Sequence, residues 1–388
     1  MRMSRELRVI LAVLAIGLGV GTVVLRAYEY RDPRRSIKDF AIDYAAARAW
    51  RAGDDPFPAD SNAMVNQYLH ASGPVEEKYE GAPPYWHPPF RLFTVLPLSW
   101  LPYEVAGVLW LLFSSVTIVV AALIFGTELG YSPRWSAVIG VAALAHPAVQ
   151  SDLSWGQVNG PLLLLLVLAW RWLRRDADAA AGIGIGVASA LKVFPAFLGL
   201  HLLAARRDRA LCASILSGGI ATLASMAIFG FGRLGRLLRL AGAYKTYGAT
   251  RFNISAGGQL QYFLGARLGI AVTIVVAVPV VAVVFWRKAL LTKDPFWTAV
   301  IAMLLVWPIT WDHYMTLALP WFAIALLRAD RWNRIGVLIA MLLCAAGVQS
   351  VGGHPGGFLA TLGLGCAFIL ECRPLGRRKT EAVVLLAG

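Results

Sequence analysis

The stretch Val9–Arg26, which reads VILAVLAIGLGVGTVVLR, is an apolar run near the start of the chain. Its length is close to the roughly 20 residues that an α-helix needs to cross the hydrocarbon core of a bilayer. The run carries no small-residue cleavage site, so we expect a retained first helix and not a signal peptide. This stretch therefore predicts a fold that is built in a membrane.

The composition of the chain agrees with placement in a membrane. The 388 residues are 58% hydrophobic and 15% charged, whereas soluble proteins carry about 25% charged residues. The net charge is +14, and the basic residues gather at short turns between apolar runs, as in cytoplasmic loops. No aromatic-interleaved basic patch is present, which excludes nucleic acid as a partner. The clusters are Arg2/Arg5/Arg8, Arg171/Arg174/Arg175, Arg206/Arg207/Arg209, Arg287/Lys288, Arg328/Arg331/Arg334 and Arg373/Arg377/Arg378/Lys379.

Alternation of these basic turns, with the N-terminus inside, predicts an all-α integral membrane protein of about twelve spanning helices. Residues 1–388 then form a single polytopic membrane domain, with external loops at 28–88 and 231–266. The segment 89–102, which Pro97 interrupts, is expected to be re-entrant or interfacial. After the first helix, spans are expected at 105–126, 134–149, 158–173, 179–192, 195–205, 210–230, 267–287, 296–310, 314–328, 335–350 and 357–372.

Two carboxylates stand near the start of the first external loop. Asp39 and Asp43 are four residues apart, so on a helix they share one face. A carboxylate beside the bilayer can accept a proton from a hydroxyl that attacks a lipid-linked substrate. Two carboxylates on an amphipathic helix can also simply face water, and the spacing alone leaves both interpretations open.

Later polar residues lie at the ends of apolar runs. Gln157 and Asn159 carry amides that suit sugar hydroxyls, or alternatively cap a helix. Lys192 stands in an apolar hairpin, where an unpaired charge costs at least about 2.5–3.5 kcal/mol. The neighbouring spans offer no evident acidic partner. A lipid phosphate or a snorkelling position would account for this lysine.

The other external segments add a second group of candidates. His313, in an expected outer turn, is a cation that could face a phosphate or simply be exposed. Asn253 and Gln259 lie in the second external loop. The same loop carries three arginines on one helical face, suited to anionic headgroups or to a lipid phosphate; these are Arg233, Arg236 and Arg239. The cysteines, expected to be packing residues without metal or disulfide spacing, are Cys212, Cys344, Cys366 and Cys372.

Short motifs follow one another in a fixed order up to about residue 328. They comprise Asp39-Phe40, Tyr44, Ala46-Ala47, Gly53, Asp55-Pro56-Phe57, Trp86-His87-Pro88-Pro89, Pro97-Leu98, Leu101-Pro102, Gly156-Gln157-Val158-Asn159, Lys192 with Pro195, Asn253 with Ser255, and Trp311 with His313-Tyr314. The ordered set resembles glycosyltransferase family 87, whose members are polyprenyl-phosphate-mannose-dependent mannosyltransferases of the GT-C class. His87 and Phe57 depart from the family pattern, which more often has tyrosine at both positions.

The resemblance implies a GT-C enzyme that transfers mannose from polyprenyl-phosphate mannose to a lipid-anchored glycan. Such an enzyme would act in glycolipid biosynthesis for the cell envelope. It would be a multi-pass protein of the bacterial inner membrane, with its active site on the periplasmic face. The family places its catalytic aspartate directly before an aromatic residue, which assigns the general base of an inverting transfer to Asp39. Asp43, where the family more often has an aromatic residue, is then a possible second carboxylate.

The remaining expected roles divide between the two substrates. Lys192, His313 and Arg251 would bind the donor phosphate. No cofactor or metal is expected. The residues expected to bind sugar and acceptor are Tyr44, His87, Gln157, Asn159, Asn253 and Gln259.

Three alternatives stay open. The same kind of lipid carrier could deliver another sugar, such as arabinofuranose. A lipid-sugar flippase would be expected to show repeated halves, and the sequence shows no internal repeat. A structural subunit without catalysis would leave Lys192 unexplained.

Overall fold

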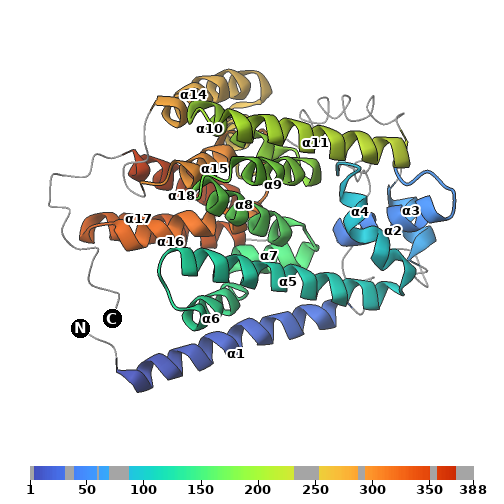
Figure 1. Ribbon diagram of the computed structural model, residues 1–388, viewed down its shortest axis with the longest axis horizontal. Helices are drawn as coiled ribbons and strands as arrows, with labels where there is room; N and C mark the ends of the chain where they lie inside the picture. The colour runs from blue at the N-terminus through green and yellow to red at the C-terminus, as the bar shows by residue number, and fades with distance from the viewer. Residues whose placement is uncertain are drawn as a thin grey trace. The chain divides into compact units, whose positions relative to one another are not determined.

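The computed structural model is helical throughout the part of the chain that it describes, in agreement with the expected all-α class. Within this part no β-strand occurs, only an isolated bridge between Asn253 and Trp311. The helices gather into two compact units, which are described separately (Figure 1). The described residues are 4–30, 39–58, 61–69, 87–230, 253–286, 293–349 and 356–372.

The first unit covers Met1–Ala122, Ala137–Ala196 and Arg209–Ala243. Its helices are α1 (Arg5–Glu29), α2 (Asp39–Arg51), α3 (Ser61–Tyr68), α4 (Arg91–Val95), η2 (Leu96–Trp100), most of α5 (Tyr103–Glu128), most of α6 (Pro133–Ala143), α7 (Pro147–Trp155), α8 (Asn159–Leu173), α9 (Asp178–Leu191), the start of η3 (Phe194–Phe197), and α11 (Asp208–Phe229).

The second unit covers Leu123–Ser136, Phe197–Asp208 and Tyr244–Gly388. Inside it, the Glu371 carboxylate is buried and accepts hydrogen bonds from Thr298 Oγ1 at 2.9 Å and Trp321 Nε1 at 3.2 Å. These bonds hold three of its helices together. The helices are α10 (Leu198–Ala204), α13 (Ala256–Leu264), α14 (Ala266–Trp286), α15 (Pro295–Val306), η5 (Asp312–Ala318), α16 (Leu319–Arg328), α17 (Arg331–Gln349) and α18 (Gly356–Glu371).

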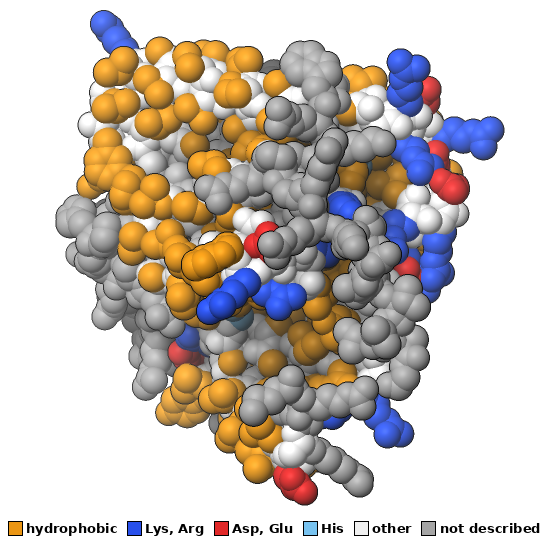
Figure 2. Space-filling view, turned by 90° about the vertical axis from the view of Figure 1, so that its left-hand side faces the viewer, with side chains coloured by type: hydrophobic (Ala, Val, Ile, Leu, Met, Phe, Trp, Pro, Cys, Tyr) orange, Lys and Arg blue, Asp and Glu red, His pale blue; other side chains and the backbone are white. Residues whose placement is uncertain are grey.

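Four helices are long and apolar enough to cross a bilayer, counting only the described residues. They are Glu6–Glu29, Tyr103–Glu128, Asp208–Phe229 and Arg267–Val284. Three of them expose large apolar side chains, as lipid-facing helices would: Leu18 is 65% exposed, Ile220 is 66% and Val275 is 70%. Figure 2 shows hydrophobic side chains spread over one face of the molecule. The chain is a membrane protein, whereas the count of twelve spans and the GT-C fold stay predictions.

The expected span 134–149 is wrong as a single helix. α6 ends at Ala143 and α7 begins at Pro147. Proline lacks the amide hydrogen that would continue the helix and disfavours helical backbone at the preceding residue. His146 accordingly has extended angles, φ −68° and ψ 136°. The break allows α7 to continue to Trp155, which places Asp152 on a helix and not in a loop.

The segment expected to be re-entrant forms two short helices, α4 and η2, of five residues each. Together they are too short to cross a hydrocarbon core of about 30 Å. Both pack on α2. Arg51 Nη1 donates to the Ser99 carbonyl at 2.5 Å, and the Tyr44 hydroxyl donates to the Leu101 carbonyl at 2.6 Å. The segment thus packs along one side of α2 and is hydrogen-bonded to it.

The predicted orientation in the membrane can be tested by cysteine labelling. We expect single cysteines replacing the exposed Ala63 and the half-buried Ser154 to react with an impermeant reagent from outside, after the native cysteines are removed. Cysteines replacing the exposed Arg175 and Asp208 should stay unlabelled until the membrane is opened. Labelling of position 175 from outside would instead make 89–102 a spanning segment and reverse the later helices.

Candidate active site

Helix α2 is oriented by its aromatic face. Phe40 stacks on Trp110 with ring centroids 5.6 Å apart, and Tyr44 lies beside Phe40 at 6.1 Å. Both aromatic side chains are completely buried. Since each directly follows an aspartate, burial of the aromatic pair turns Asp39 and Asp43 together toward the neighbouring polar residues. The sequence-based expectation that these carboxylates share a face therefore agrees with the structure.

Asp43 is a core residue. Its carboxylate and the Arg91 guanidinium are both 0% exposed, with Arg91 Nε 2.6 Å from Asp43 Oδ2. His87 Nδ1 lies 2.8 Å from Asp43 Oδ1. Because a carboxylate can only accept, this nitrogen carries the hydrogen that is shared. Two contacts on opposite oxygens hold the Asp43 carboxylate in place and tie α2 to α4.

Asp39 is the accessible member of the pair. Its side chain is 28% exposed, whereas that of Asp43 is fully buried. Gln157 Nε2 donates to Asp39 Oδ2, and His87 Nε2 lies 3.7 Å from the same oxygen. Asp39 is the first residue of α2, where the helix dipole stabilises the ionised carboxylate. The arrangement holds a carboxylate in position while part of it stays accessible from outside the protein.

The turn between α7 and α8 brings Gln157 to this position. Gly156 ends α7 in the left-handed conformation, with φ +64°. A Cβ atom there would lie 2.5 Å from Phe40 Cβ and 2.6 Å from the Tyr30 hydroxyl oxygen, so only glycine fits. Trp110 Nε1 donates to the Gly156 carbonyl at 2.9 Å. This turn places the Gln157 amide between Asp39 and Arg91. Arg91 Nη1 donates to Gln157 Oε1 at 3.4 Å.

A second set of hydrogen bonds continues from this turn to α9. Asn159 Nδ2 donates to Asp152 Oδ1 at 2.7 Å, and Lys192 Nζ donates to Asn159 Oδ1 at 3.2 Å. All three side chains are buried, with Lys192 5% exposed. α9 ends at Leu191, and Lys192 follows in extended backbone, φ −146° and ψ 134°. One amide thus bridges a buried carboxylate and a buried ammonium.

This geometry corrects the expectation that Lys192 has no acidic residue nearby. The carboxylates of Asp152, Asp39 and Asp43 attract the Lys192 ammonium. The Arg91 guanidinium repels it. Burial raises the pKa of the Asp152 carboxyl, and the charge of Lys192 and hydrogen bonds from Asn159 oppose that rise. The cluster contains the carboxylates of Asp39, Asp43 and Asp152, the basic side chains of Arg91 and Lys192, and the imidazole of His87.

Tyr44, Asn253 and Gln259, all expected to bind sugar, are committed to contacts within the protein. The buried Tyr44 hydroxyl is held by the Leu101 carbonyl. Asn253 Nδ2 donates to the Pro308 carbonyl at 2.8 Å, and its Oδ1 accepts from the Thr310 amide at 2.9 Å. Gln259 Nε2 donates to the Asn253 carbonyl at 2.6 Å. These residues shape the fold locally, and their expected role in sugar binding stays a prediction.

Two other residues, His313 and Arg251, were expected to bind the donor phosphate, and the structure describes only the first of them. His313, considered as an exposed loop residue, is only 6% exposed, and its Nδ1 lies 3.4 Å from Asp312 Oδ1. Arg251 lies outside the described residues, as do Arg233, Arg236 and Arg239. Within the described ranges, no group of three or more His, Cys, Asp and Glu residues could hold a metal ion.

Two residues of the cluster were missed in the sequence. Arg91 follows the Pro88-Pro89 motif and had been grouped with an interfacial segment, yet it is the fully buried partner of Asp43. Asp152 stands just before the polar run Ser154–Asn159. The sequence feature that could have identified both residues is their charge, because ionisable residues beside apolar runs are rare without partners.

Apolar spanning helices and a buried polar cluster around one accessible carboxylate are features of an enzyme embedded in a membrane. Comparison with protein families gives its class: residues 85–308, more than half of the chain, match Glycosyltransferase family 87. The chain belongs to glycosyltransferase family 87 and is a membrane glycosyltransferase. No match was found among curated proteins or solved structures. The matched residues include His87, Arg91 and Lys192 but not α2, so the assignment of Asp39 rests on its own motif and geometry.

Proposed function

We propose that this glycosyltransferase transfers mannose from polyprenyl-phosphate mannose to a lipid-anchored glycan, with inversion, on the outer face of the bacterial inner membrane. A GT-C fold would provide the apolar grooves for the lipid chain. The observation that carries the proposal is the contrast between the two aspartates. Asp43 is buried in an ion pair with Arg91, whereas Asp39 is held by Gln157 and stays 28% exposed.

The contrast supports a single displacement with Asp39 as base. The acceptor hydroxyl gives its proton to the Asp39 carboxylate, and its oxygen forms a bond to the anomeric carbon of mannose. The bond between that carbon and the phosphate oxygen breaks on the opposite face, and the lipid phosphate leaves with the electron pair. A base in hydrogen-bond reach contributes about 10²–10⁴-fold to such a step. The substrate would approach the exposed part of the Asp39 carboxylate.

Lys192 is the proposed partner of the departing phosphate in the described part of the site. A cation that faces developing negative charge stabilises the transition state. Its ammonium already interacts with the charges of Asp39 and Asp152, so it belongs to the same electrostatic cluster as the base. The contributions expected from His313 and Arg251 remain predictions from the sequence.

The decisive experiment supplies the purified protein with labelled polyprenyl-phosphate mannose and a panel of membrane lipids. We expect a labelled glycolipid whose new linkage has the anomeric configuration opposite to that of the donor. Polyprenyl-phosphate arabinofuranose, tested in parallel, should give no product. Transfer of arabinose alone would replace mannose in the proposal, and movement of the donor across vesicles without transfer would favour a flippase.

Lys192→Gln is expected to weaken binding of polyprenyl phosphate, with or without a sugar, by roughly ten- to a hundredfold. The reason is loss of one charged hydrogen-bond donor, which contributes about 1.5–3 kcal/mol. Lys192→Arg should keep part of the affinity, since the charge survives with altered reach. Titration in nanodiscs measures the dissociation constants, and the exposed Lys293→Gln is the control of equal charge. Equal affinity in wild type and Lys192→Gln would remove Lys192 from the phosphate site.

A further inference from the structure

Asp152 is a buried carboxyl group that the proposed transfer does not use. It lies on the last turn of α7 and is 0% exposed. Its backbone carbonyl accepts from the Gln157 amide at 3.1 Å, so the turn that places Gln157 beside Asp39 also fixes Asp152. Its Oδ1 accepts from Asn159 Nδ2 at 2.7 Å, whereas its Oδ2 has no hydrogen-bond partner in the described part of the chain. Because an ionised carboxylate accepts on both oxygens, this environment suits the charged form poorly.

The charges around Asp152 decide whether it is ionised. Burial raises the pKa of its carboxyl to about 7. The Lys192 ammonium opposes this rise most strongly, ahead of the Asn159 hydrogen bonds and the Arg91 guanidinium. Tyr30, which follows α1, is also buried and interacts electrostatically with Asp152. Lys192 is therefore the main charge that keeps Asp152 ionised near neutral pH.

The same lysine is the proposed partner of the lipid phosphate. A phosphate that binds the Lys192 ammonium offsets its positive charge and brings a negative charge beside the cluster. Both effects favour the neutral form of a buried carboxyl nearby. The two groups are connected by Asn159, because Lys192 Nζ donates to its Oδ1 at 3.2 Å while its Nδ2 donates to Asp152. Binding of phosphate at Lys192 would therefore weaken the interaction that stabilises the Asp152 carboxylate.

We propose that Asp152 is the counter-ion of Lys192 before the donor binds, and that it takes up one proton from water when the lipid phosphate arrives. The proposal rests on the proposed phosphate site at Lys192. In this step the Asp152 carboxylate and a solvent proton form a carboxylic acid, and the ammonium balances the phosphate alone. The proton returns to water when the lipid phosphate leaves, and it is separate from the proton that Asp39 accepts. Asp152 thus acts on the phosphate only through Lys192, as a positioning residue.

Binding of a phosphodiester that lacks a sugar tests this proposal. Polyprenyl methyl phosphate carries one negative charge at every pH used, so the probe itself does not titrate. We expect its affinity for wild-type protein in neutral nanodiscs to be constant below about pH 6. Above about pH 7 the affinity should fall by up to about tenfold per pH unit, because the bound state holds one more proton. Calorimetry in two buffers of different ionisation enthalpy should show uptake that approaches one proton per bound probe.

The substitution Asp152→Asn assigns the proton to a residue. Asparagine keeps an oxygen for the Asn159 amide but has no charge to lose. At about pH 8.5 the variant should bind the probe at least about tenfold more tightly than wild type, whereas the two should match at about pH 6. The variant should take up no proton. A purely structural role for Asp152 would instead lower the affinity of the variant at every pH.

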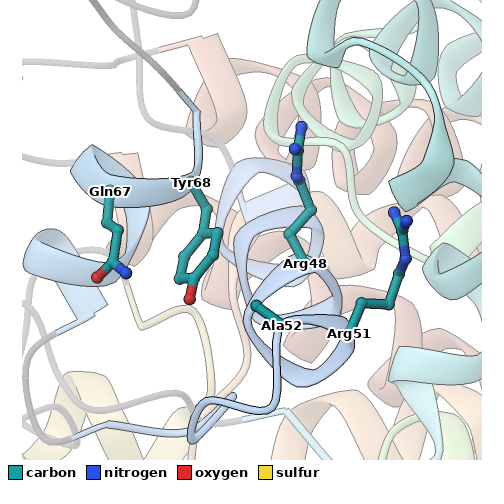
Figure 3. Close-up of a pocket in the computed structure, with 5 residues that line it drawn as sticks. All are labelled: Arg48, Arg51, Ala52, Gln67 and Tyr68. Atoms are coloured by element: carbon teal, nitrogen blue, oxygen red, sulfur yellow. The ribbon is translucent and has the colours of Figure 1, made fainter.

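A matched control lies beyond the C-terminal end of α2. Asp54 is exposed and accepts a hydrogen bond from Tyr68, one of the residues that line the cavity in Figure 3. Asp54→Asn removes the same charge outside the cluster around Asp39 and Lys192. It should keep the wild-type affinity and the wild-type pH dependence.

Several results would overturn the proposal. One is an affinity of wild-type protein that does not change with pH, and another is an affinity of Asp152→Asn that is lower at every pH. Proton uptake that persists in Asp152→Asn would assign the proton to Lys192 or His87 instead. If the variant does not fold, difference infrared spectroscopy of wild-type protein decides, because binding must produce the carbonyl band of a newly protonated carboxylic acid. Mannosyl transfer without proton uptake would refute the role of Asp152 and leave the proposed reaction standing, whereas uptake without transfer would do the reverse.

Discussion

Replacement of Asp39 by asparagine is expected to reduce the turnover number by about 10²–10⁴-fold, the contribution typical of a positioned general base. Asparagine has nearly the same shape and keeps an oxygen for the Gln157 amide, but it cannot accept a proton at neutral pH. Since Asp39 is 28% exposed and stands outside the buried Asp43–Arg91 pair, we expect the melting temperature to change little. Transfer from labelled donor and thermal unfolding, measured on the same preparation, check both statements.

A matched control is available on the same chain. Asp176 is exposed and has φ 55°, a left-handed conformation that asparagine adopts readily, so Asp176→Asn should keep full activity and stability. Donor binding should also survive in Asp39→Asn, because the proposed phosphate partner is Lys192. Normal turnover in Asp39→Asn would exclude it as the base and direct attention to other groups of the cluster.

Replacement of Asp43 by asparagine is expected to act mainly on stability. The substitution leaves the fully buried Arg91 guanidinium without its counter-charge, and breaking one side of a buried pair costs about 3–5 kcal/mol. We expect a clearly lower melting temperature in detergent and faster proteolysis, with activity lost in proportion to folded protein. From the sequence, Asp43 was a possible second carboxylate; its burial against Arg91 is the reason to expect an effect on stability.

A double substitution distinguishes the ion pair from other causes of instability. Asp43→Asn combined with Arg91→Met removes both charges, so it should be less destabilising than the sum of the single changes. Unfolding temperatures of the four proteins give the coupling between the two residues. If the single changes prove additive, or if Asp43→Asn is as stable as wild type, the pair does not hold α2 to α4 as inferred.

The sequence predicted those features that depend on local pattern. Apolar length gave the positions of α5, α8 and α11 to within a few residues. The four-residue spacing of Asp39 and Asp43 predicted their common face. The interruption at Pro147 was a local signal too, but the apolar residues around it concealed the break between α6 and α7.

Pairing between distant segments was not predictable in the same way. Arg91 lies in the segment 89–102, which was expected to be re-entrant or interfacial, whereas its guanidinium is buried against Asp43 of α2. Asn253 and Gln259 were expected to bind sugar, whereas the Asn253 amide contacts the backbone of Pro308 and Thr310, and the Gln259 amide donates to the Asn253 carbonyl. Polar composition indicates where chemistry is possible, but only the three-dimensional contacts show which groups are already occupied.

The spread of the cluster along the chain has a consequence for biosynthesis. His87 follows Asp43 by 44 residues, and Gln157 follows Asp39 by 118 residues. At about 5–20 residues per second, synthesis of those 118 residues takes roughly 6–24 s. During that time the nascent chain carries Asp39 without the amide that orients it, and Lys192 has yet to be made. A ribosome-bound chain would therefore be inserted well before it can bind substrate, and activity cannot begin until Lys192 has been synthesised and has reached the cluster.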